Sequence, residues 1–366
     1  MLGETANQLS GARAALSTGR RGKKLIPIRP KICYYFNMLK RMRPIQASPK
    51  VLNYLKYRAA TRLPALSTRH YTPQIAGLLL NKRCNLNCDI CYVGTMLNEP
   101  DWQKSEASLE KVKPIITHKL FRNCLLVDLM GGEPLLVEDL DQIVAYLTSN
   151  GHLTNLSTNG VLLADRVADL KRAGISHINI SLYEENRRVL ERHLAQINRV
   201  FQVDTSLVLL RTELEARLEQ LVSTARFVHE AGCGSLRIFV YRPMGRDPQQ
   251  KDLIPYDDPA WLELRRRVDD VVPNFCLWPT PPRPGPAGKR CVQLWQKIWC
   301  DMEGNVFACC GVAAPLSGPN SNLFDGAPDA ILNHPTFVSM RRKLLDPLSD
   351  PPDPCKSCNL LSDSGW

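Results

Sequence analysis

Three cysteines in a short span are the residues of this sequence best suited to chemistry. Cys84, Cys88 and Cys91 are spaced C-x3-C-x2-C and follow the apolar run at residues 75–80. The run predicts a short buried strand, so the cysteines occupy the loop at its carboxyl end. Three thiolates can hold three irons of an iron–sulfur cube and leave the fourth open, whereas a structural zinc site normally takes four protein ligands. The spacing therefore predicts an incomplete metal cage.

A second motif, Gly131-Gly132-Glu133-Pro134, follows a predicted strand at residues 124–130. Its glycines lack a Cβ atom and let the backbone approach a ligand closely. Glu133 offers an anionic acceptor for an ammonium group. Taken alone, such a turn is more often a plain strand-to-helix junction with proline at the first helical position. Its place about forty residues after the cysteine loop, in the next βα unit, favours a shared site.

A further set of cysteines lies in the last quarter of the chain. The pattern is C-x12-G-x4-C followed by C-x2-C, at Cys291, Gly304, Cys309, Cys355 and Cys358. Residues 299–306 predict a β-hairpin that turns at Glu303-Gly304. Four thiolates complete a closed site, which on spacing alone suits structural zinc as well as an iron–sulfur cluster.

Most of the other cysteines are expected to be buried small apolar side chains. They are Cys33, Cys124, Cys233, Cys276, Cys300 and Cys310. Cys310 adjoins Cys309 and is an alternative ligand. Ten of the thirteen cysteines fall in the two clusters or after residue 275, which favours metal ligation in a reducing, cytoplasmic compartment. The seven histidines form no ligand-spaced pair and are expected at the surface or at strand ends.

Strands alternate with helices between residues 75 and 241. The predicted strands are 75–80, 124–130, 153–158, 177–182, 204–210 and 235–241, with helices of 13 to 20 residues between most of them. This alternation predicts an α/β fold with a parallel sheet, and six units fit a partial (β/α)6 TIM-like barrel. Chemistry belongs at the carboxyl ends of such strands. The elements that fall there are the cysteine loop, the GGEP turn, residues 158–160, Ser181 and the turn at 242–246.

The charge of the chain is unevenly distributed. Residues 1–70 hold 15 Lys and Arg against one acidic residue, a balance of +14, so the remainder carries −3 of the total +11. We expect a basic leader at 1–70, partly disordered or helical, which is a candidate contact for an anionic or membrane surface. A barrel at 71–250, a helix and Pro-rich linker at 251–290 and a small cysteine-rich domain at 291–366 follow. No transmembrane segment or secretory signal is expected.

The cysteine loop and the GGEP turn together resemble the radical S-adenosylmethionine (SAM) superfamily, over residues of about 75 to 246. The resemblance implies a [4Fe–4S] cluster on Cys84, Cys88 and Cys91, with SAM on the open iron. It also implies cofactor contacts from Gly131, Gly132, Glu133, Ser157, Asn159, Ser181 and Arg211. The implied reaction is reductive cleavage of SAM to a 5′-deoxyadenosyl radical, which abstracts hydrogen from a substrate C–H bond. A flavodoxin- or ferredoxin-type electron donor is the expected partner.

The C-terminal cysteines resemble the SPASM/twitch extension of that superfamily, as do residues 321–324 and the basic segment at 340–344. A full SPASM domain has further cysteines and two auxiliary clusters, whereas this sequence ends eight residues after Cys358. One auxiliary [4Fe–4S] cluster is therefore expected, held by four protein thiolates. Its ligands would be Cys291, Cys309, Cys355 and Cys358.

The resemblance leaves the substrate open. Peptide or protein modification is the leading hypothesis, by an oxidoreductase or maturase-type enzyme. Oxidation, epimerisation or coupling of a carbohydrate or small metabolite is the alternative. Cys310, Cys300 and Cys233 are candidate hydrogen donors to a substrate radical, as thiols are in radical epimerases. A hypothesis of another class is a non-catalytic zinc- or nucleic-acid-binding protein that uses the basic leader, although the leader lacks interleaved aromatic stacking motifs.

Overall fold

A nine-stranded sheet organises this protein, in the order β7-β6-β5-β4-β3-β2-β1-β8-β9. The structure is a computed structural model that describes residues 44–60, 71–91, 106–241, 252–255, 257–279, 291–310, 312, 314–346, 348–352, 355 and 358. The leader up to residue 43, the turn at 242–246 and residues 280–290 of the Pro-rich linker lie outside these ranges. The described residues belong to one of the two units of the chain, residues 42–366.

Six parallel strands form the barrel part of the sheet. They are β1 (Ile75–Leu79), β2 (Leu126–Met130), β3 (Leu153–Thr158), β4 (His177–Ser181), β5 (Val203–Leu209) and β6 (Leu236–Val240). Neighbours in this series pair in parallel from β1 to β6. The predicted α/β class and partial barrel are confirmed, and each strand lies within two residues of its predicted bounds.

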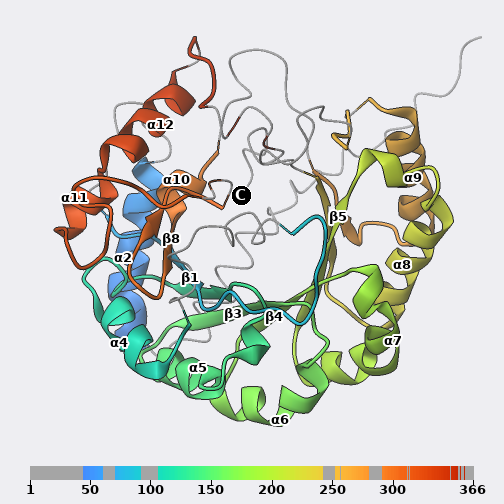
Figure 1. The fold of residues 1–366 in the computed structure, drawn as a ribbon, viewed down its shortest axis with the longest axis horizontal. Helices are drawn as coiled ribbons and strands as arrows, with labels where there is room; N and C mark the ends of the chain where they lie inside the picture. The colour runs from blue at the N-terminus through green and yellow to red at the C-terminus, as the bar shows by residue number, and fades with distance from the viewer. Residues whose placement is uncertain are drawn as a thin grey trace, which may run out of the picture. The chain divides into compact units, whose positions relative to one another are not determined.

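Five helices connect these strands and cover one face of the sheet, which we call the outer face (Figure 1). They are α4 (Leu109–Thr117), α5 (Leu140–Ser149), α6 (Leu163–Ala173), α7 (Glu184–Asn198) and α8 (Leu218–Glu230). Ser108 caps α4 by accepting a hydrogen bond from the backbone of Lys111. Gly174 ends α6 in the left-handed conformation, at φ 85°, as its position in the sequence predicts.

The two faces of the sheet differ in polarity because side chains alternate along each strand. On β4, Ile178 and Ile180 face the helices and are fully buried. His177, Asn179 and Ser181 lie on the opposite, inner face and are half-buried. The inner face therefore offers polar side chains, and the outer face supplies the apolar core.

Three further strands extend the sheet beyond the six predicted units. β7 (Cys276–Leu277) pairs with β6, and β8 (Lys297–Asp301) runs parallel to β1. β9 (Val306–Phe307) returns antiparallel to β8, which confirms the predicted hairpin. Gly304 stands at its turn with φ 82°, a conformation that glycine adopts at little cost. The first strands of the cysteine-rich segment thus share the barrel's sheet.

The remaining helices lie before and after the six units. They are α2 (Pro44–Ala60), α9 (Pro259–Val271), α10 (Gln293–Gln296), α11 (Pro328–Leu332) and α12 (Pro335–Leu345), with short 3₁₀ turns η2 (Pro134–Leu136) and η3 (Arg211–Glu213). In the described part of the chain, no helix has the length and apolar character needed to span a membrane.

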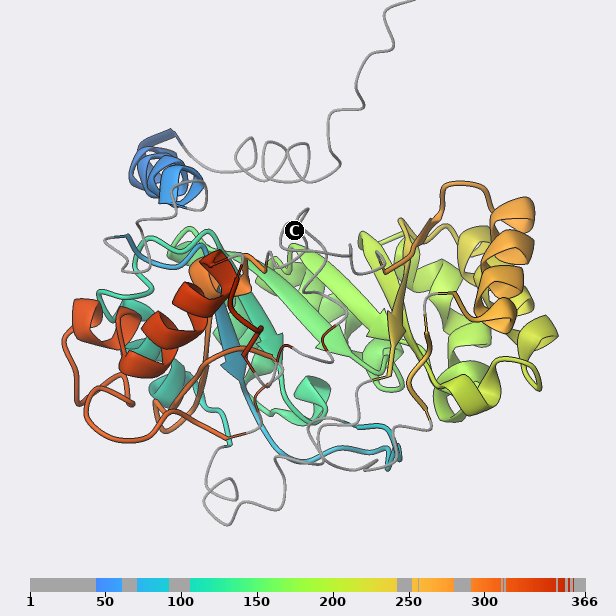
Figure 2. The same cartoon turned by 90° about the horizontal axis from the view of Figure 1, so that it is seen from above.

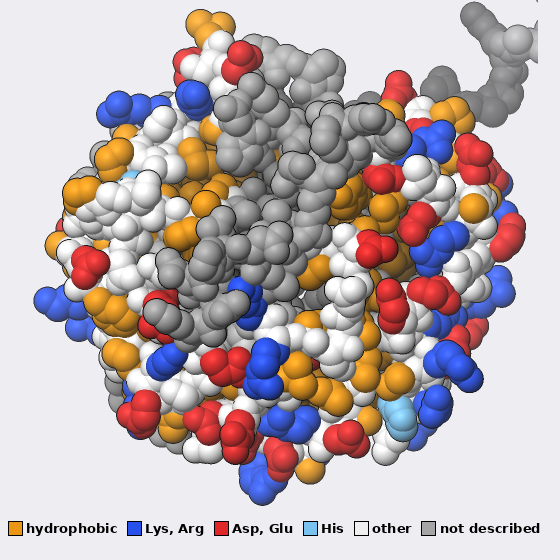
Figure 3. Space-filling model, in the orientation of Figure 1, with side chains coloured by type: hydrophobic (Ala, Val, Ile, Leu, Met, Phe, Trp, Pro, Cys, Tyr) orange, Lys and Arg blue, Asp and Glu red, His pale blue; other side chains and the backbone are white. Residues whose placement is uncertain are grey.

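Helix α2 is anchored at the amino ends of the strands. Its buried Lys50 ammonium donates to the carbonyl oxygens of Cys124 and Gly151, each at 2.8 Å, just before β2 and β3. Figure 2 shows α2 (blue) at one end of the strands and the loop after β1 (cyan) at the other. On the face seen in Figure 3, acidic and basic side chains intersperse around the helices, in keeping with the near-neutral charge predicted for the body.

Candidate functional site

The cysteine loop follows β1 at the carboxyl edge of the sheet. Cys84 is exposed, and Cys88 and Cys91 are half-buried. The amide of Cys91 donates to the carbonyl of Cys88 at 3.0 Å, so the last two cysteines share a tight turn. The Cys84 sulfur accepts from the amide of Leu86 at 3.4 Å. The loop thus presents three thiols on a short, internally bonded stretch.

The two glycines of the GGEP turn let it pack directly against the start of the cysteine loop. The amide of Gly132 donates to the carbonyl of Asn81 at 2.8 Å, and that of Glu133 donates to the carbonyl of Arg83 at 2.7 Å. A Cβ atom on Gly132 would lie 2.3 Å from the Arg83 carbonyl oxygen. The glycines were predicted to let the backbone approach a ligand closely, but on this side of the turn they let it approach the backbone of the cysteine loop.

Glu133 joins the GGEP turn to the turn after β3. Its side chain is fully buried and accepts from the Thr158 hydroxyl at 2.6 Å, the Asn159 amide at 2.8 Å and the Leu135 amide at 3.0 Å. Burial raises the pKa of Glu133 above its usual value, although these three hydrogen bonds favour the charged form. Here the carboxylate is satisfied by protein donors, whereas the resemblance assigned it to the cofactor.

Asn159 carries the connection back to the cysteines. Its side-chain nitrogen Nδ2 donates to the side-chain oxygen of Asn85 at 2.8 Å and lies 3.8 Å from the Cys84 sulfur. Its backbone carbonyl accepts from the Asn186 side chain at 2.7 Å, which also donates to the carbonyl of Ser181 at 2.7 Å. The turns after β2, β3 and β4 therefore converge on the cysteine loop, as their predicted position at the carboxyl ends implied.

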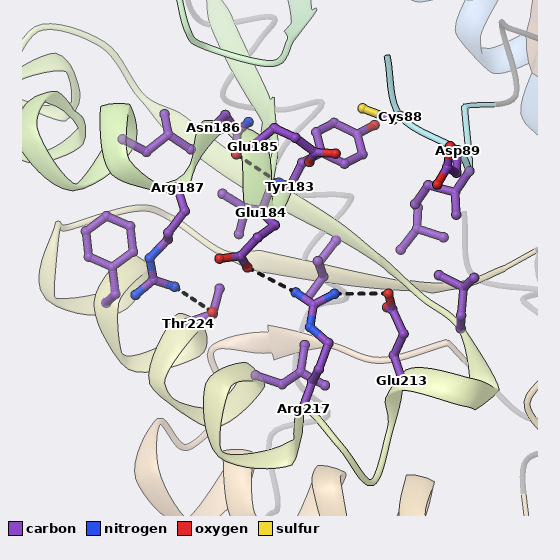
Figure 4. Close-up of a pocket in the computed structure, with 18 residues that line it drawn as sticks. Cys88, Asp89, Tyr183, Glu184, Glu185, Asn186, Arg187, Glu213, Arg217 and Thr224 are labelled. Atoms are coloured by element: carbon purple, nitrogen blue, oxygen red, sulfur yellow. Dashed lines mark hydrogen bonds and ion pairs between the residues drawn. The ribbon is translucent and has the colours of Figure 1, made fainter. Parts of the chain in front are cut away.

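A pocket of about 190 Å³ opens beside this loop (Figure 4). Cys88, Asp89 and Ile90 form one wall, and residues from the turn after β4 and from β5, η3, α7 and α8 form the others. Its walls are largely apolar, and its rim is charged. Arg217 lies between Glu184 at 3.3 Å and Glu213 at 3.1 Å, in the ion pairs drawn in Figure 4.

Tyr183 links this pocket to the cysteine site. Figure 4 shows its hydroxyl turned toward Cys88. Burial raises the pKa of Tyr183 beyond its usual range, and the neighbouring thiols Cys88 and Cys91 add to this rise. Neither Tyr183 nor Asn186 was predicted from the sequence as a site residue. Their position in the first turn after strand four is the signal that could have pointed to them.

Comparison with known proteins decides what this site belongs to. Residues 78–245 match the family model described as the Radical SAM superfamily. This segment is a radical SAM domain. It runs from β1 to just beyond β6 and contains both the cysteine loop and the GGEP turn. The domain implies a [4Fe–4S] cluster and SAM as cofactors, and it supports enzymatic activity.

Two curated relatives align with parts of the chain. The AdoMet-dependent heme synthase of Methanosarcina barkeri is 26% identical over 50% of this chain and 55% of its own length. The probable GTP 3',8-cyclase of Aeropyrum pernix is 34% identical over 31% of this chain and 33% of its own length. The matched part of the chain thus spans about half the length of the heme synthase and about a third of the length of the cyclase.

Solved structures share the fold over a larger part of the chain. Streptococcus suis SuiB bound to its precursor peptide SuiA superposes with a TM-score of 0.59, over 87% of this chain and 76% of that one. SuiB bound to S-adenosylmethionine gives 0.58, over 80% and 72%. Sequence identities of 15% and 16% restrict this likeness to the fold.

The donor set of the radical SAM domain fits a cationic iron–sulfur cluster. Burial, together with the nearby Glu185, Cys91 and Cys84, raises the pKa of Cys88 to about 12. Burial also raises the pKa of Cys84, with smaller contributions from Glu133 and Cys91. The thiols are thus surrounded by negative or acidic groups, so metal binding would supply the positive charge that favours their thiolate form.

Two predicted cofactor residues, Ser157 and Arg211, lie outside this bonded cluster, whereas Ser181 is bonded to Asn186 and Tyr183. Ser157 and Ser181 lie on the inner face near the carboxyl ends of β3 and β4, and both are half-buried. The guanidinium of Arg211 forms ion pairs with Asp258, the cap of α9, and with Glu215 at 3.6 Å. Arg211 therefore has two carboxylate partners within the protein, although the resemblance assigned its side chain to the cofactor.

The C-terminal cysteines gather around Cys291. Its pKa is raised chiefly by burial and then by Cys358, Cys355 and Cys310. Cys310 also packs against an apolar cluster of Leu79, Trp299 and Phe307, which joins β1 to the hairpin. The structure brings two of the three predicted partners of Cys291 close to it, together with Cys310, the alternative to Cys309.

The other candidate thiols lie elsewhere. Cys233 precedes β6, at the amino edge of the sheet and so opposite the cysteine loop. Cys300 is fully buried within β8. Among the residues that the structure describes, no three Cys, His, Asp or Glu side chains are arranged as ligands of a single metal ion.

Proposed function

We propose that this protein is a radical SAM enzyme that modifies a peptide or protein substrate. Cys84, Cys88 and Cys91 would hold the cluster, and the carboxyl edge of the sheet would hold SAM. When bound, the cluster and SAM supply a one-electron reductive cleavage that yields a 5′-deoxyadenosyl radical. The observation that carries the proposal is the clamping of a three-thiol loop by the GGEP turn and Asn159.

The residues of the chain would orient the cofactor and exclude water. Backbone bonds from Gly132 and Glu133 fix the start of the cysteine loop. The pocket beside Cys88 and Ile90 has apolar walls and a charged rim, which suits a flat ring joined to a hydroxylated sugar, such as the adenosyl group. Tyr183 closes the pocket toward the thiols. These groups would position SAM, while the cofactors carry the difficult chemistry.

A peptide or protein substrate is supported by the shared fold. SuiB, which has this fold across most of the chain, was crystallised with its precursor peptide. The C-terminal cysteines around Cys291 would hold one auxiliary cluster, and a flavodoxin- or ferredoxin-type protein would supply the electron. Cys310 would complete the ligand set or donate hydrogen, since it is close to Cys291 and also packs against residues of β1, β8 and β9.

Anaerobic reconstitution tests the proposal. About eight irons and matching sulfide per chain are expected for two cubane clusters. With dithionite and SAM, the protein should form 5′-deoxyadenosine, and Cys84→Ala should abolish it. Cys276→Ala, a buried cysteine outside both clusters, is the matched control and should keep the activity. Zinc without sulfide, or undiminished SAM cleavage by the Cys84 variant, would refute the proposal.

A further inference from the structure

A row of polar side chains crosses the inner face of the sheet from β8 to β6. We call it the inner-face ladder. Its members are Lys297, Asp128, Asn155, His177, Asp204 and Ser235, which come from β8, β2, β3, β4, β5 and the residue before β6. β1 contributes Gly77, whose missing side chain leaves room for the ring of Trp299. The ladder lies outside the cofactor cluster described above, and no role in that cluster accounts for it.

Hydrogen bonds run through the ladder without a break from β2 to β4. The Asn155 amide nitrogen donates to the Asp128 carboxylate at 2.5 Å. Asn155 therefore presents its oxygen to Nδ1 of His177, 2.6 Å away. Because an amide oxygen only accepts, Nδ1 of His177 must donate this bond.

The second ring nitrogen of His177 faces a carboxylate. Nε2 lies 2.8 Å from the Asp204 carboxylate, which accepts a further bond from the Ser235 hydroxyl at 2.9 Å. The pKa of Asp204 lies below its usual value, since hydrogen bonds and charge from His177, Ser235 and Arg237 together outweigh burial. Asp204 is therefore a negatively charged member of the ladder.

The charges at the two ends of the ladder occur as opposed pairs. Lys297 forms an ion pair with Asp128 and also stands 3.5 Å from the centre of the Trp299 ring. His177 and Arg237 both act on Asp204. A phosphate placed here would be repelled by Asp128 and Asp204 and attracted by Lys297 and Arg237, so attraction and repulsion would offset each other.

The ladder remains accessible to uncharged polar groups. The side chains of Asp128, His177 and Asp204 are 15%, 13% and 28% exposed. The carboxylate oxygens of Asp128 and Asp204 can accept further hydrogen bonds, and Asn155 has a second amide N–H to donate, which match amides and hydroxyls. His177 shares its face of β4 with Ser181, about 13 Å further along the strand. The ladder thus lies on the same face as the cofactor edge, two inward-facing positions below it along β4.

We propose that the inner-face ladder binds an uncharged, hydrogen-bonding part of the substrate, an amide or a hydroxyl group, and disfavours phosphate-bearing compounds. The proposal rests on the proposed function, because it takes the inner face as the side on which substrate meets the radical. The amide could belong to a peptide and the hydroxyl to a sugar. A nucleoside triphosphate is the excluded class.

Calorimetry with two matched probes tests the exclusion. Guanosine and GTP share base and sugar and differ only in the triphosphate. The reconstituted, SAM-loaded enzyme should bind GTP no more tightly than guanosine. Asp128→Asn and Asp204→Asn each remove a neutralising carboxylate, so each should raise the affinity for GTP about tenfold. GTP affinity about tenfold above that of guanosine in the wild type, or no gain in either variant, would overturn the proposal.

Asp169→Asn provides the control. It frees Arg172 from an exposed pair on α6, away from the inner face, and should leave both affinities unchanged. An equal gain in this variant would show that the effect is non-specific and would overturn the proposal. Circular dichroism and the urea midpoint establish that each variant is folded. If one of the two ladder variants, Asp128→Asn or Asp204→Asn, does not fold, the other still provides the test.

Two neutral probes distinguish the possible sources of the group. An acetylated, amidated asparagine represents the peptide amide, and methyl glucoside represents the sugar hydroxyl. At least one should bind, and Asn155→Leu should weaken it about fivefold, since one hydrogen bond is worth about 1 kcal/mol. Binding of neither contradicts the proposal. If no 5′-deoxyadenosine forms while these affinities hold, the proposed function fails and the ladder's ligand class stands.

Discussion

Glu133 illustrates at the residue scale how the site is held together. A buried carboxylate is costly unless its lone pairs are satisfied, and here the donors come from Thr158, Asn159 and Leu135. The turn after β2 is thereby fixed to the turn after β3. Asn159 then passes the constraint to Asn85 and Cys84. A residue that the motif alone assigns to a ligand thus serves as an internal brace.

Replacing Glu133 by Gln should destabilise the fold. The amide would turn an N–H group toward one of three donors, leaving a buried polar pair unsatisfied at a cost of about 1–3 kcal/mol. Urea unfolding of the metal-free protein measures this loss. Glu110→Gln, which removes one partner of an exposed ion pair, should change the free energy of unfolding by less than about 0.5 kcal/mol. An unchanged urea midpoint for Glu133→Gln would contradict the role of Glu133 as an internal brace.

At the scale of elements, strand ends and the turns that follow them place the chemistry. The loop after β1 and the turn after β2 touch through backbone atoms, which only glycine allows at Gly132. At the opposite edge, α2 closes the amino ends of β2 and β3 through Lys50. One edge of the sheet therefore carries the thiols, and the other carries a structural anchor.

Gly132→Ala should displace the cysteine loop, since its Cβ would meet the Arg83 carbonyl at 2.3 Å and neither backbone can yield freely. We expect a fall of about tenfold or more in 5′-deoxyadenosine formation, with iron content reduced as well. Gly174→Ala is the control, because φ is 85° there but the residue ends α6 away from the site. It should lower stability by about 1 kcal/mol and keep the activity. Equal activities in the two variants would contradict the proposed role of the contact between Gly132 and the cysteine loop.

The anchor of α2 predicts a pH dependence of stability. Burial, and then the charge of Lys50, lowers the pKa of His152 to about 3 from an ordinary 6.5. Between these values the unfolded chain binds a proton that the folded protein does not, so stability falls as the pH falls, by about 1.4 kcal/mol per pH unit. His152→Gln should flatten this slope in urea titrations from pH 7 to 4. The exposed His229→Gln should retain the wild-type slope, and a retained slope in both would refute the attribution.

At the scale of the whole described unit, β8 joins the two cysteine clusters. It pairs in parallel with β1, whose loop carries the first cluster, and it lies between Cys291 and Cys309 in the chain. Trp299 and Phe307 pack with Leu79 across this junction. The cysteine-rich segment is thus continuous with the barrel through backbone hydrogen bonds.

Loss of the second cluster should therefore weaken the fold and spare the first reaction. Cys358→Ala is expected to retain about half of the iron and to unfold at a lower temperature, because metal binding contributes to folding. The rate of 5′-deoxyadenosine formation should stay within about threefold of wild type. Iron analysis, thermal unfolding and product assay report these quantities. Complete loss of iron would show that the two sites are not independent.

The sequence by itself determined the local features of this protein. Alternation of apolar and polar residues gave the six strands, and the spacing of Cys84, Cys88 and Cys91 with the GGEP turn indicated the radical SAM domain. Such signals depend on residues that are close in the chain, where strand periodicity and turn chemistry act directly. The placement of both motifs at one edge followed from the parallel sheet.

Only the tertiary structure decided which distant residues meet. Lys297 reaches Asp128 across 169 positions of the chain, and His177 links Asn155 to Asp204 between three strands. Asn186 and Tyr183 likewise join the site through contacts between turns. No periodicity encodes these pairs, because they arise from strand order and register, which depend on the packing of the whole sheet. The cysteine motif is local in the sequence, whereas the inner face that would meet its substrate is assembled by the fold.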